Sequence, residues 1–330
     1  MSFQEDNSLD SAEQNPDSSL RENHPEKISS SAPAEAPIPT GLSGDLARVP
    51  SIPYAQRPDV PEDLRITWSW VHFICLVLFS VLALVIVQTI LTIHYAPHEQ
   101  LSAKELQQFL LGIPQFVVLT TVALFGAVFL FFYVTLSVLP GQPFWSTLGW
   151  RKLHPSKSPF YPRAWIFVVL GAILSVVVWL VGSQVHTPDD MPVEALMKTR
   201  TGFLLMMGMA VVVAPLVEET LFRGYLYPLL VRLVSGSAAH FGAAPARATR
   251  AGVASSIVAT GVLFGLLHGG QLSWTWGIVS LLILVGIIFT YVRARTGTVV
   301  ASFLMHLGYN SFIAILSLFQ MPPPGNLPPH

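Results

Sequence analysis

Seven apolar segments dominate the sequence from residue 66 onward. Each is long enough to cross the ~30 Å hydrocarbon core of a membrane as a helix. With 52% hydrophobic and 11% charged residues, the chain is also far more apolar than a soluble domain. We therefore predict an all-α, polytopic transmembrane helix bundle of about seven spans. The segments are residues 66–93, 113–139, 164–186, 202–234, 252–268, 274–292 and 298–318.

The fourth segment is too long for one straight span. Pro215 lies inside it and is expected to kink the helix through the loss of one backbone hydrogen bond. The kink would lie three residues before Glu218 and would open local space for water. Splitting this segment in two gives an alternative count of eight spans.

Two polar regions flank the helical part. Residues 1–63 are rich in Ser, Pro, Asn, Asp and Glu and have no apolar periodicity, so we expect a disordered N-terminal tail. Residues 321–330 are rich in proline and are expected to form a second flexible tail. The transmembrane domain then covers residues 64–320.

Basic residues are concentrated in alternate loops. Residues 140–163 contain four basic side chains and no acidic one, and residues 232–250 and 293–295 are also basic. Two of the alternate loops, residues 94–108 and 187–201, contain more acidic than basic side chains. Seven spans with a cytoplasmic N-terminus place all the basic loops inside, as the positive-inside rule requires. We therefore expect a cytoplasmic N-terminus.

Three ionisable residues lie close together in the fourth segment: Glu218, Glu219 and Arg223. A charged group in hydrocarbon costs at least ~2.5–3.5 kcal/mol, so such residues usually indicate a site. Glu219 and Arg223 have the i,i+4 spacing of a helical ion pair, whereas Glu218 lies about 100° further round the helix. We predict that Glu219 and Arg223 form a brace and that Glu218 acts as a general base. The alternative is a buried salt bridge that only fixes helix packing.

Two later segments contain polar pairs at one-turn spacing. Phe264 and His268 form the first pair, and His306 and Asn310 form the second. Neighbouring glycines would let the helices approach closely and bring these side chains to Glu218. The two histidines point to different openings of the site. His306 lies in the inner half of its span, which favours access from the cytoplasm, whereas His268 lies late in its span, which favours the opposite side.

These residue types together predict hydrolysis of an amide. Glu218 could take a proton from water, while His268 and His306 could position that water or protonate the leaving amine. Asn310 could donate a hydrogen bond to the developing oxyanion. Two histidines and a carboxylate are also a common catalytic zinc set, so Zn²⁺ bound by His268, His306 and Glu218 is a further candidate.

The three motifs together resemble those of the CPBP family, the type II CAAX prenyl proteases, Abi proteins and bacteriocin-processing enzymes. That family has the patterns E-E-x-x-x-R, F-x-x-x-H and H-x-x-x-N, in this order. The resemblance covers roughly residues 200–318, which we take as the motif-bearing core. The matching stretches are E-E-T-L-F-R at 218–223, F-G-L-L-H at 264–268 and H-L-G-Y-N at 306–310.

The resemblance implies an intramembrane endopeptidase. Glu218 would be the general base, Glu219 and Arg223 supporting charges, His268 and His306 essential partners, and Asn310 an oxyanion ligand. Both a metalloprotease mechanism and a metal-free, glutamate-dependent one are implied for this family.

The implied substrate is a CAAX-type or leader peptide, lipidated or not. The expected partners are membrane lipid and a peptide or protein, without nucleic acid. The implied location is the bacterial inner membrane.

Two other functions fit the same buried polar cluster. Intramembrane carboxylates and histidines can relay protons in a proton-coupled transporter. A non-catalytic scaffold could also use the cluster to specify helix packing.

Overall fold

The computed structural model describes residues 54–186 and 200–320. They belong to one compact unit that begins at Ser51. The expected disorder of residues 1–53 and the expected flexible tail at 321–330 lie outside the described residues. The described part therefore corresponds to the predicted transmembrane domain and the residues just before it.

The described residues are helical and contain no strand, so the predicted all-α bundle is confirmed for them. Within residues 54–186 and 200–320, seven helical stretches are long and apolar enough to cross a membrane, in agreement with the predicted count of seven. The helices are α1 (Trp70–Tyr95), α2 (Ala103–Leu111), α3 (Pro114–Phe132), α4 (Phe144–Thr147), α5 (Trp165–Gly182), α7 (Arg200–Gly208), α8 (Ala214–Glu218), α9 (Tyr227–His240), α10 (Pro245–Leu267), α11 (Trp276–Thr296) and α12 (Val299–Gln320).

The fourth span is one uninterrupted helical run of 41 residues, Arg200–His240. It joins α7, α8 and α9 through two π-helical segments, η4 (Met209–Val213) and η5 (Glu219–Leu226). At 1.5 Å per residue the run is about 60 Å long, roughly twice the hydrocarbon thickness. It therefore extends beyond the membrane instead of splitting into two spans.

Each π-helical segment ends just before a proline. The Ala214 N–H donates to the Met209 carbonyl, five residues back, and Pro215 follows. The Tyr227 N–H likewise donates to the Phe222 carbonyl, and Pro228 follows. The wider turns accommodate the two prolines within a continuous helix.

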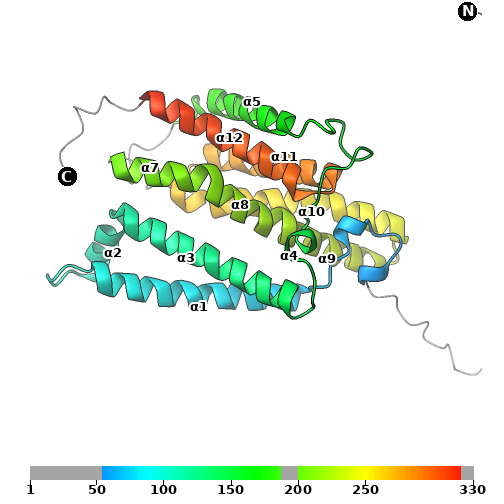
Figure 1. The fold of residues 1–330 in the computed structure, drawn as a ribbon, viewed down its shortest axis with the longest axis horizontal. Helices are drawn as coiled ribbons and strands as arrows, with labels where there is room; N and C mark the ends of the chain where they lie inside the picture. The colour runs from blue at the N-terminus through cyan, green and yellow to red at the C-terminus, as the bar shows by residue number, and fades with distance from the viewer. Residues whose placement is uncertain (1–53, 187–199, 321–330) are drawn as a thin grey trace, which may run out of the picture. The chain divides into compact units, whose positions relative to one another are not determined.

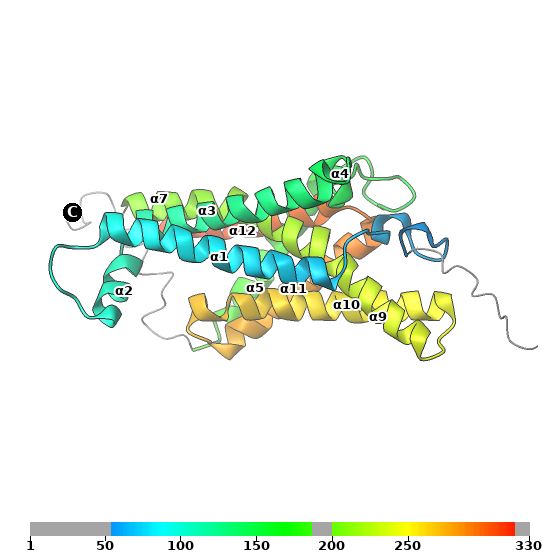
Figure 2. The ribbon, with the colours of Figure 1, turned by 90° about the horizontal axis from the view of Figure 1, so that it is seen from below.

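The bundle has two ends, which Figures 1 and 2 show side-on. At the α2 end lie α2, the start of α7 and the turn between α10 and α11. At the α4 end lie α4, residues 54–69, the turn between α9 and α10 and the turn between α11 and α12. Helices α5 and α12 pack closely at Gly171 and Gly308. The lack of a side chain allows this approach, since a Cβ at either position would overlap the facing backbone.

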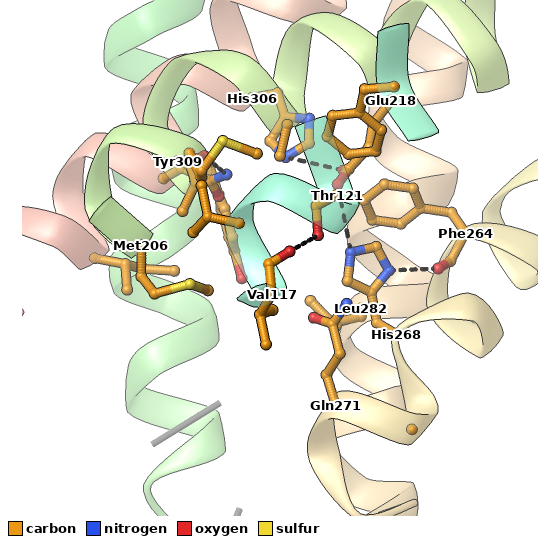
Figure 3. Close-up of a pocket in the computed structure, with 18 of the residues that line it drawn as sticks. Val117, Thr121, Met206, Glu218, Phe264, His268, Gln271, Leu282, His306 and Tyr309 are labelled. Carbon is orange, nitrogen blue, oxygen red and sulfur yellow. Dashed lines mark hydrogen bonds and ion pairs between the residues drawn. The ribbon is translucent and has the colours of Figure 1, made fainter. Parts of the chain in front are cut away.

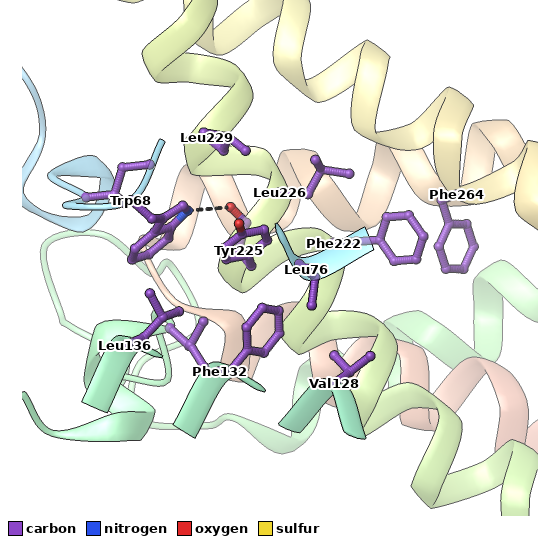
Figure 4. Close-up of a cluster of buried hydrophobic side chains, with 12 residues drawn as sticks. Trp68, Leu76, Val128, Phe132, Leu136, Phe222, Tyr225, Leu226, Leu229 and Phe264 are labelled. Atoms are coloured by element: carbon purple, nitrogen blue, oxygen red, sulfur yellow. Dashed lines mark hydrogen bonds between the residues drawn. The ribbon is translucent and has the colours of Figure 1, made fainter. Parts of the chain in front are cut away.

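A large buried apolar cluster fills the α4 half of the bundle (Figure 4). Trp68 stacks on Tyr225 with ring centroids 5.4 Å apart, and Phe132 lies 4.8 Å from the same ring. The Trp68 indole N–H donates to the Tyr225 carbonyl at 3.3 Å. The cluster thus joins the segment before α1 to α3 and η5.

Residues 54–63 are folded, so the expected tail ends earlier than residue 63. Two short 3₁₀ turns, η1 (Tyr54–Gln56) and η2 (Glu62–Leu64), pack with Val60 on α9. The Asp63 carboxylate lies 2.9 Å from Arg293 Nη1 and 3.1 Å from Lys157 Nζ. Arg293 follows 230 residues later in the chain, so this pairing has no local sequence signature.

The Asp63–Arg293 pair makes the stability pH-dependent. Burial raises the pKa of the Asp63 carboxyl, but Arg293 and Lys157 outweigh it and hold the pKa below its ordinary value. Because the pKa of Asp63 is lower in the folded state, its carboxylate stabilises the fold at pH values above its unfolded pKa of about 3.9. This contribution is lost as the pH falls through the pKa of the folded state.

We predict that Asp63→Asn lowers the free energy of unfolding by about 3 kcal/mol near neutral pH, because Arg293 would keep a buried, uncompensated charge. Thermal unfolding in detergent measures this. The difference from the parent chain should shrink only when the pH falls below the ordinary carboxyl range.

Glu62→Gln is the matched control. Its carboxylate is 79% exposed and lies 3.2 Å from Arg151. Removing so exposed a charge should change stability by less than about 0.5 kcal/mol. Equal losses in the two variants would contradict the assigned role of Asp63.

Candidate active site

A cavity of about 510 Å³ lies among α3, α7, α8, α10, α11 and α12 (Figure 3). Its walls are mainly apolar, with Val117 and Phe125 from α3, Met206 from α7 and Leu282 from α11. Its polar side chains are Thr121, Glu218, His268, Gln271, His306, Tyr309 and Asn310. The structure therefore brings four of the six predicted site residues to one cavity.

The other two, Glu219 and Arg223, form an ion pair beside the cavity. Arg223 Nη1 lies 3.0 Å from Glu219 Oε1, and both side chains are 0% exposed. The same guanidinium donates to the Gly286 carbonyl at 3.0 Å and to the Thr290 hydroxyl at 3.2 Å, both on α11. Arg223 is thus held by three acceptors, as expected for a brace.

Aromatic rings complete the surroundings of Arg223. Its guanidinium carbon lies 4.5 Å from the centroid of Phe264 and 5.5 Å from that of Phe289. A cation over a ring face is stabilised by the ring quadrupole, most strongly where water is absent. The phenylalanine of the F-x-x-x-H motif therefore contacts the arginine of the first motif.

His306 is oriented by the ion pair. Its Nδ1 lies 3.0 Å from Glu219 Oε1, and a carboxylate oxygen only accepts, so this nitrogen bears the proton. Its Nε2 is left facing Glu218 Oε2 at 3.9 Å. Glu219 thus binds Arg223 and His306 with the same oxygen.

His268 is oriented by the backbone of its own helix. Its Nδ1 donates to the Phe264 carbonyl at 2.7 Å, which requires a proton on that nitrogen. Its Nε2 lies 3.8 Å from Glu218 Oε1. Both histidines therefore present Nε2 to the same carboxylate, as Figure 3 shows.

The two adjacent glutamates occupy different environments. The Glu218 side chain is 19% exposed and faces the cavity, whereas that of Glu219 is 0% exposed. The separations of 3.8 and 3.9 Å between Glu218 and the imidazoles exceed a hydrogen bond and allow a bridging water. Glu218 is the carboxylate that a substrate can reach.

Asn310 is held by the π-helical segment η4. Its amide nitrogen donates to the Ala210 carbonyl at 2.7 Å. In the five-residue register of η4, that carbonyl would receive the N–H of residue 215, and Pro215 has none. Asn310 therefore replaces the donor that proline lacks, and its second amide hydrogen remains for a substrate.

The three side chains proposed as zinc ligands do not form a metal site. Glu218, His268 and His306 converge, yet no group of three His, Cys, Asp or Glu among the described residues is arranged to hold an ion. The arrangement therefore does not support the zinc candidate.

Several contacts could not be found from the sequence. The Gly286 and Phe264 carbonyls hold Arg223 and His268, and backbone groups have no sequence signature. Thr290 could have been noticed as a buried hydroxyl in an apolar span. Thr121 and Gln271, which line the cavity, lie outside the three motifs.

Comparison with known proteins found one family model that matches part of the chain. Residues 200–312 match the family model described as type II CAAX prenyl endopeptidase Rce1-like. The match covers about a third of the 330 residues and includes all six predicted site residues. It is consistent with the CPBP family and confirms the resemblance seen in the motifs. No curated protein and no solved structure matched the chain.

The different environments of the two glutamates lead to a stability prediction. Glu219→Gln should lower the free energy of unfolding by about 3–5 kcal/mol, because it leaves the Arg223 charge buried without a counter-ion. Glu218→Gln should lower it by less than about 1 kcal/mol, since water in the cavity can solvate either side chain. Thermal unfolding of both variants in detergent measures the contrast. Equal losses of stability in the two variants would contradict the role of Glu219 and Arg223 as a structural brace.

The link between Asn310 and Pro215 can be tested by a double-mutant cycle. Asn310→Leu should destabilise the parent by about 1–3 kcal/mol, because the Ala210 carbonyl loses its donor. In a Pro215→Ala background an N–H becomes available, so the same change should cost about 1 kcal/mol less. Pro228→Ala, which restores an N–H away from Asn310, is the control background. Identical costs in all three backgrounds would contradict the link.

Proposed function

We propose that this chain, whose residues 200–312 form an Rce1-like CAAX-type endopeptidase domain, hydrolyses peptide bonds with water activated by Glu218. The observation that supports this most directly is the position of Glu218. It is the one carboxylate of the pair that faces the cavity, opposite the Nε2 atoms of two oriented histidines. Such an arrangement suits a general base.

In the proposed reaction the Glu218 carboxylate takes one proton from water. The water oxygen adds to the carbon of the scissile carbonyl, whose π electrons move to its oxygen and give a tetrahedral oxyanion. When the carbonyl re-forms, the C–N bond breaks and the proton on Glu218 passes to the leaving amine. One water is consumed, one new carboxyl and one new amino terminus form, and Glu218 is restored.

The neighbouring residues have supporting roles in this proposal. His268 and His306 position the water through Nε2 or relay the proton to the amine. Asn310 donates its second amide hydrogen to the oxyanion. Glu219 and Arg223 do not touch the substrate, and they fix the position of His306.

The proposed substrate is a peptide or protein segment with an apolar portion. The walls of the cavity include Val117, Phe125, Met206 and Leu282, which suit an apolar side chain or an attached lipid. Methionine adapts its shape to different apolar partners, so the pocket need not select one side chain. The proposed location is the bacterial inner membrane, with the N-terminus in the cytoplasm, as the loop charges favour.

The buried surroundings favour hydrolysis over the two alternatives. A proton-coupled transporter needs a polar route across the whole membrane. On the α4 side of Glu218, the structure places the buried ion pair and the apolar cluster of Figure 4. A scaffold that only packs helices has no need of an apolar cavity beside an accessible carboxylate.

The test compares newly formed peptide termini in membranes containing the parent chain or Glu218→Gln. The variant should lose at least about 100-fold of the cleavage, the lower range for general-base catalysis. Equal amounts and melting temperatures of the two proteins are required. Full activity of the variant would overturn the proposal.

Glu62→Gln is the matched control for this experiment. It makes the same change of a glutamate to a glutamine at the α4 end, outside the cavity. Its pattern of new termini should equal that of the parent. A loss in both variants would mean that the cleavage does not depend on Glu218 specifically.

A further inference from the structure

The two ends of the bundle differ strongly in charge. The α4 end contains the loop 140–163, with four basic side chains and no acidic one, together with Arg247, Arg250, Arg293 and Arg295, while residues 54–69 add three acidic and two basic side chains. At the α2 end, the connection between α1 and α3 contains Glu99, Lys104 and Glu105, α7 begins with Arg200, and the turn between α10 and α11 has no charge. The positive-inside rule therefore places the α4 end in the cytoplasm.

The cavity reaches the surface at the opposite end. Its lining includes Leu111 at the end of α2, and Gly270 and Gln271 in the turn after α10, and all three are exposed. Figure 3 shows Gln271 on the far side of His268 from Glu218. The lining thus runs from Glu218 to connecting segments at the α2 end.

Toward the α4 end the site is closed by buried groups. Glu219 and Arg223 are 0% exposed, and Phe132, Phe222 and Tyr225 pack beyond them. None of the residues that line the cavity belongs to the basic loops. A substrate has no described route to Glu218 from that side.

We infer that the cavity opens to the extracytoplasmic side of the membrane. The substrate class follows, and this part rests on the proposed function. It consists of exported or membrane-anchored polypeptides whose cleaved segment lies on or near the outer face. The C-terminal peptides of cytosolic proteins would be on the wrong side of the membrane.

The orientation can be tested without any substrate. The single native thiol is removed by Cys75→Ala, and one cysteine is then introduced per variant. Gln271→Cys and Gln100→Cys report on the α2 end, and Ser156→Cys and Ala246→Cys report on the α4 end. All four positions are exposed, and two reporters per end cover the loss of one variant through misfolding.

Spheroplasts of a bacterial expression host are treated with a membrane-impermeant maleimide before or after lysis. Both α2-end cysteines should react before lysis, and both α4-end cysteines only after it. The reverse pattern would overturn the inference, and so would equal labelling of the two ends before lysis.

The substrate class has a separate readout. New termini that depend on Glu218 should map to extracytoplasmic segments of membrane or exported proteins. If they map to cytoplasmic segments, the inferred substrate class is wrong although the chain is a protease. If none depends on Glu218 while the labelling is as expected, the proposed function fails and the orientation stands.

Discussion

The buried ion pair between Glu219 and Arg223 is the interaction on which the rest of the site depends. Two charges removed from solvent need additional polar partners to offset the cost of their desolvation. Arg223 therefore requires the Gly286 carbonyl and Thr290 of α11, and Glu219 also accepts from His306 of α12. The pair fixes the register of three helices. Because Glu219 is occupied in this way, Glu218 is the carboxylate left to face the cavity.

The prolines show how sequence and geometry are linked in the fourth span. A proline in a membrane helix leaves a carbonyl without a donor, so a kink beside Glu218 was a reasonable expectation. The structure has a π-helical segment before each proline of this span, within one continuous helical run. Asn310 then donates to the Ala210 carbonyl that Pro215 cannot serve. A π-helical register has no periodicity of its own in so short a segment, which is why the sequence did not indicate it.

Features set by segment length and local spacing could be predicted. The seven spans follow from apolar length, and the Glu219–Arg223 pair from its four-residue separation. Contacts between distant segments could not be predicted. Asp63 lies in a polar stretch that resembles a tail, yet it pairs with Arg293. The carbonyl that orients His268 is likewise invisible in the sequence. The convergence of His268, His306 and Asn310 was expected because neighbouring glycines allow close helix packing and because these residue types suit one reaction.

The closure of the cavity and the support of His306 have a common physical origin. Arg223 and Glu219 are 0% exposed and pair through Glu219 Oε1, so the pair closes the side of Glu218 that faces the α4 end, although Glu219 Oε2 has no hydrogen-bond partner among the described residues. The packed rings of Phe222 and Phe264 next to the pair exclude it. In the proposed reaction, water would therefore reach Glu218 through the mouth at the α2 end, and the new termini would leave by the same mouth. The proposed site would then operate from one face of the membrane only. The brace that orients the chemistry also determines the side from which a substrate is reached.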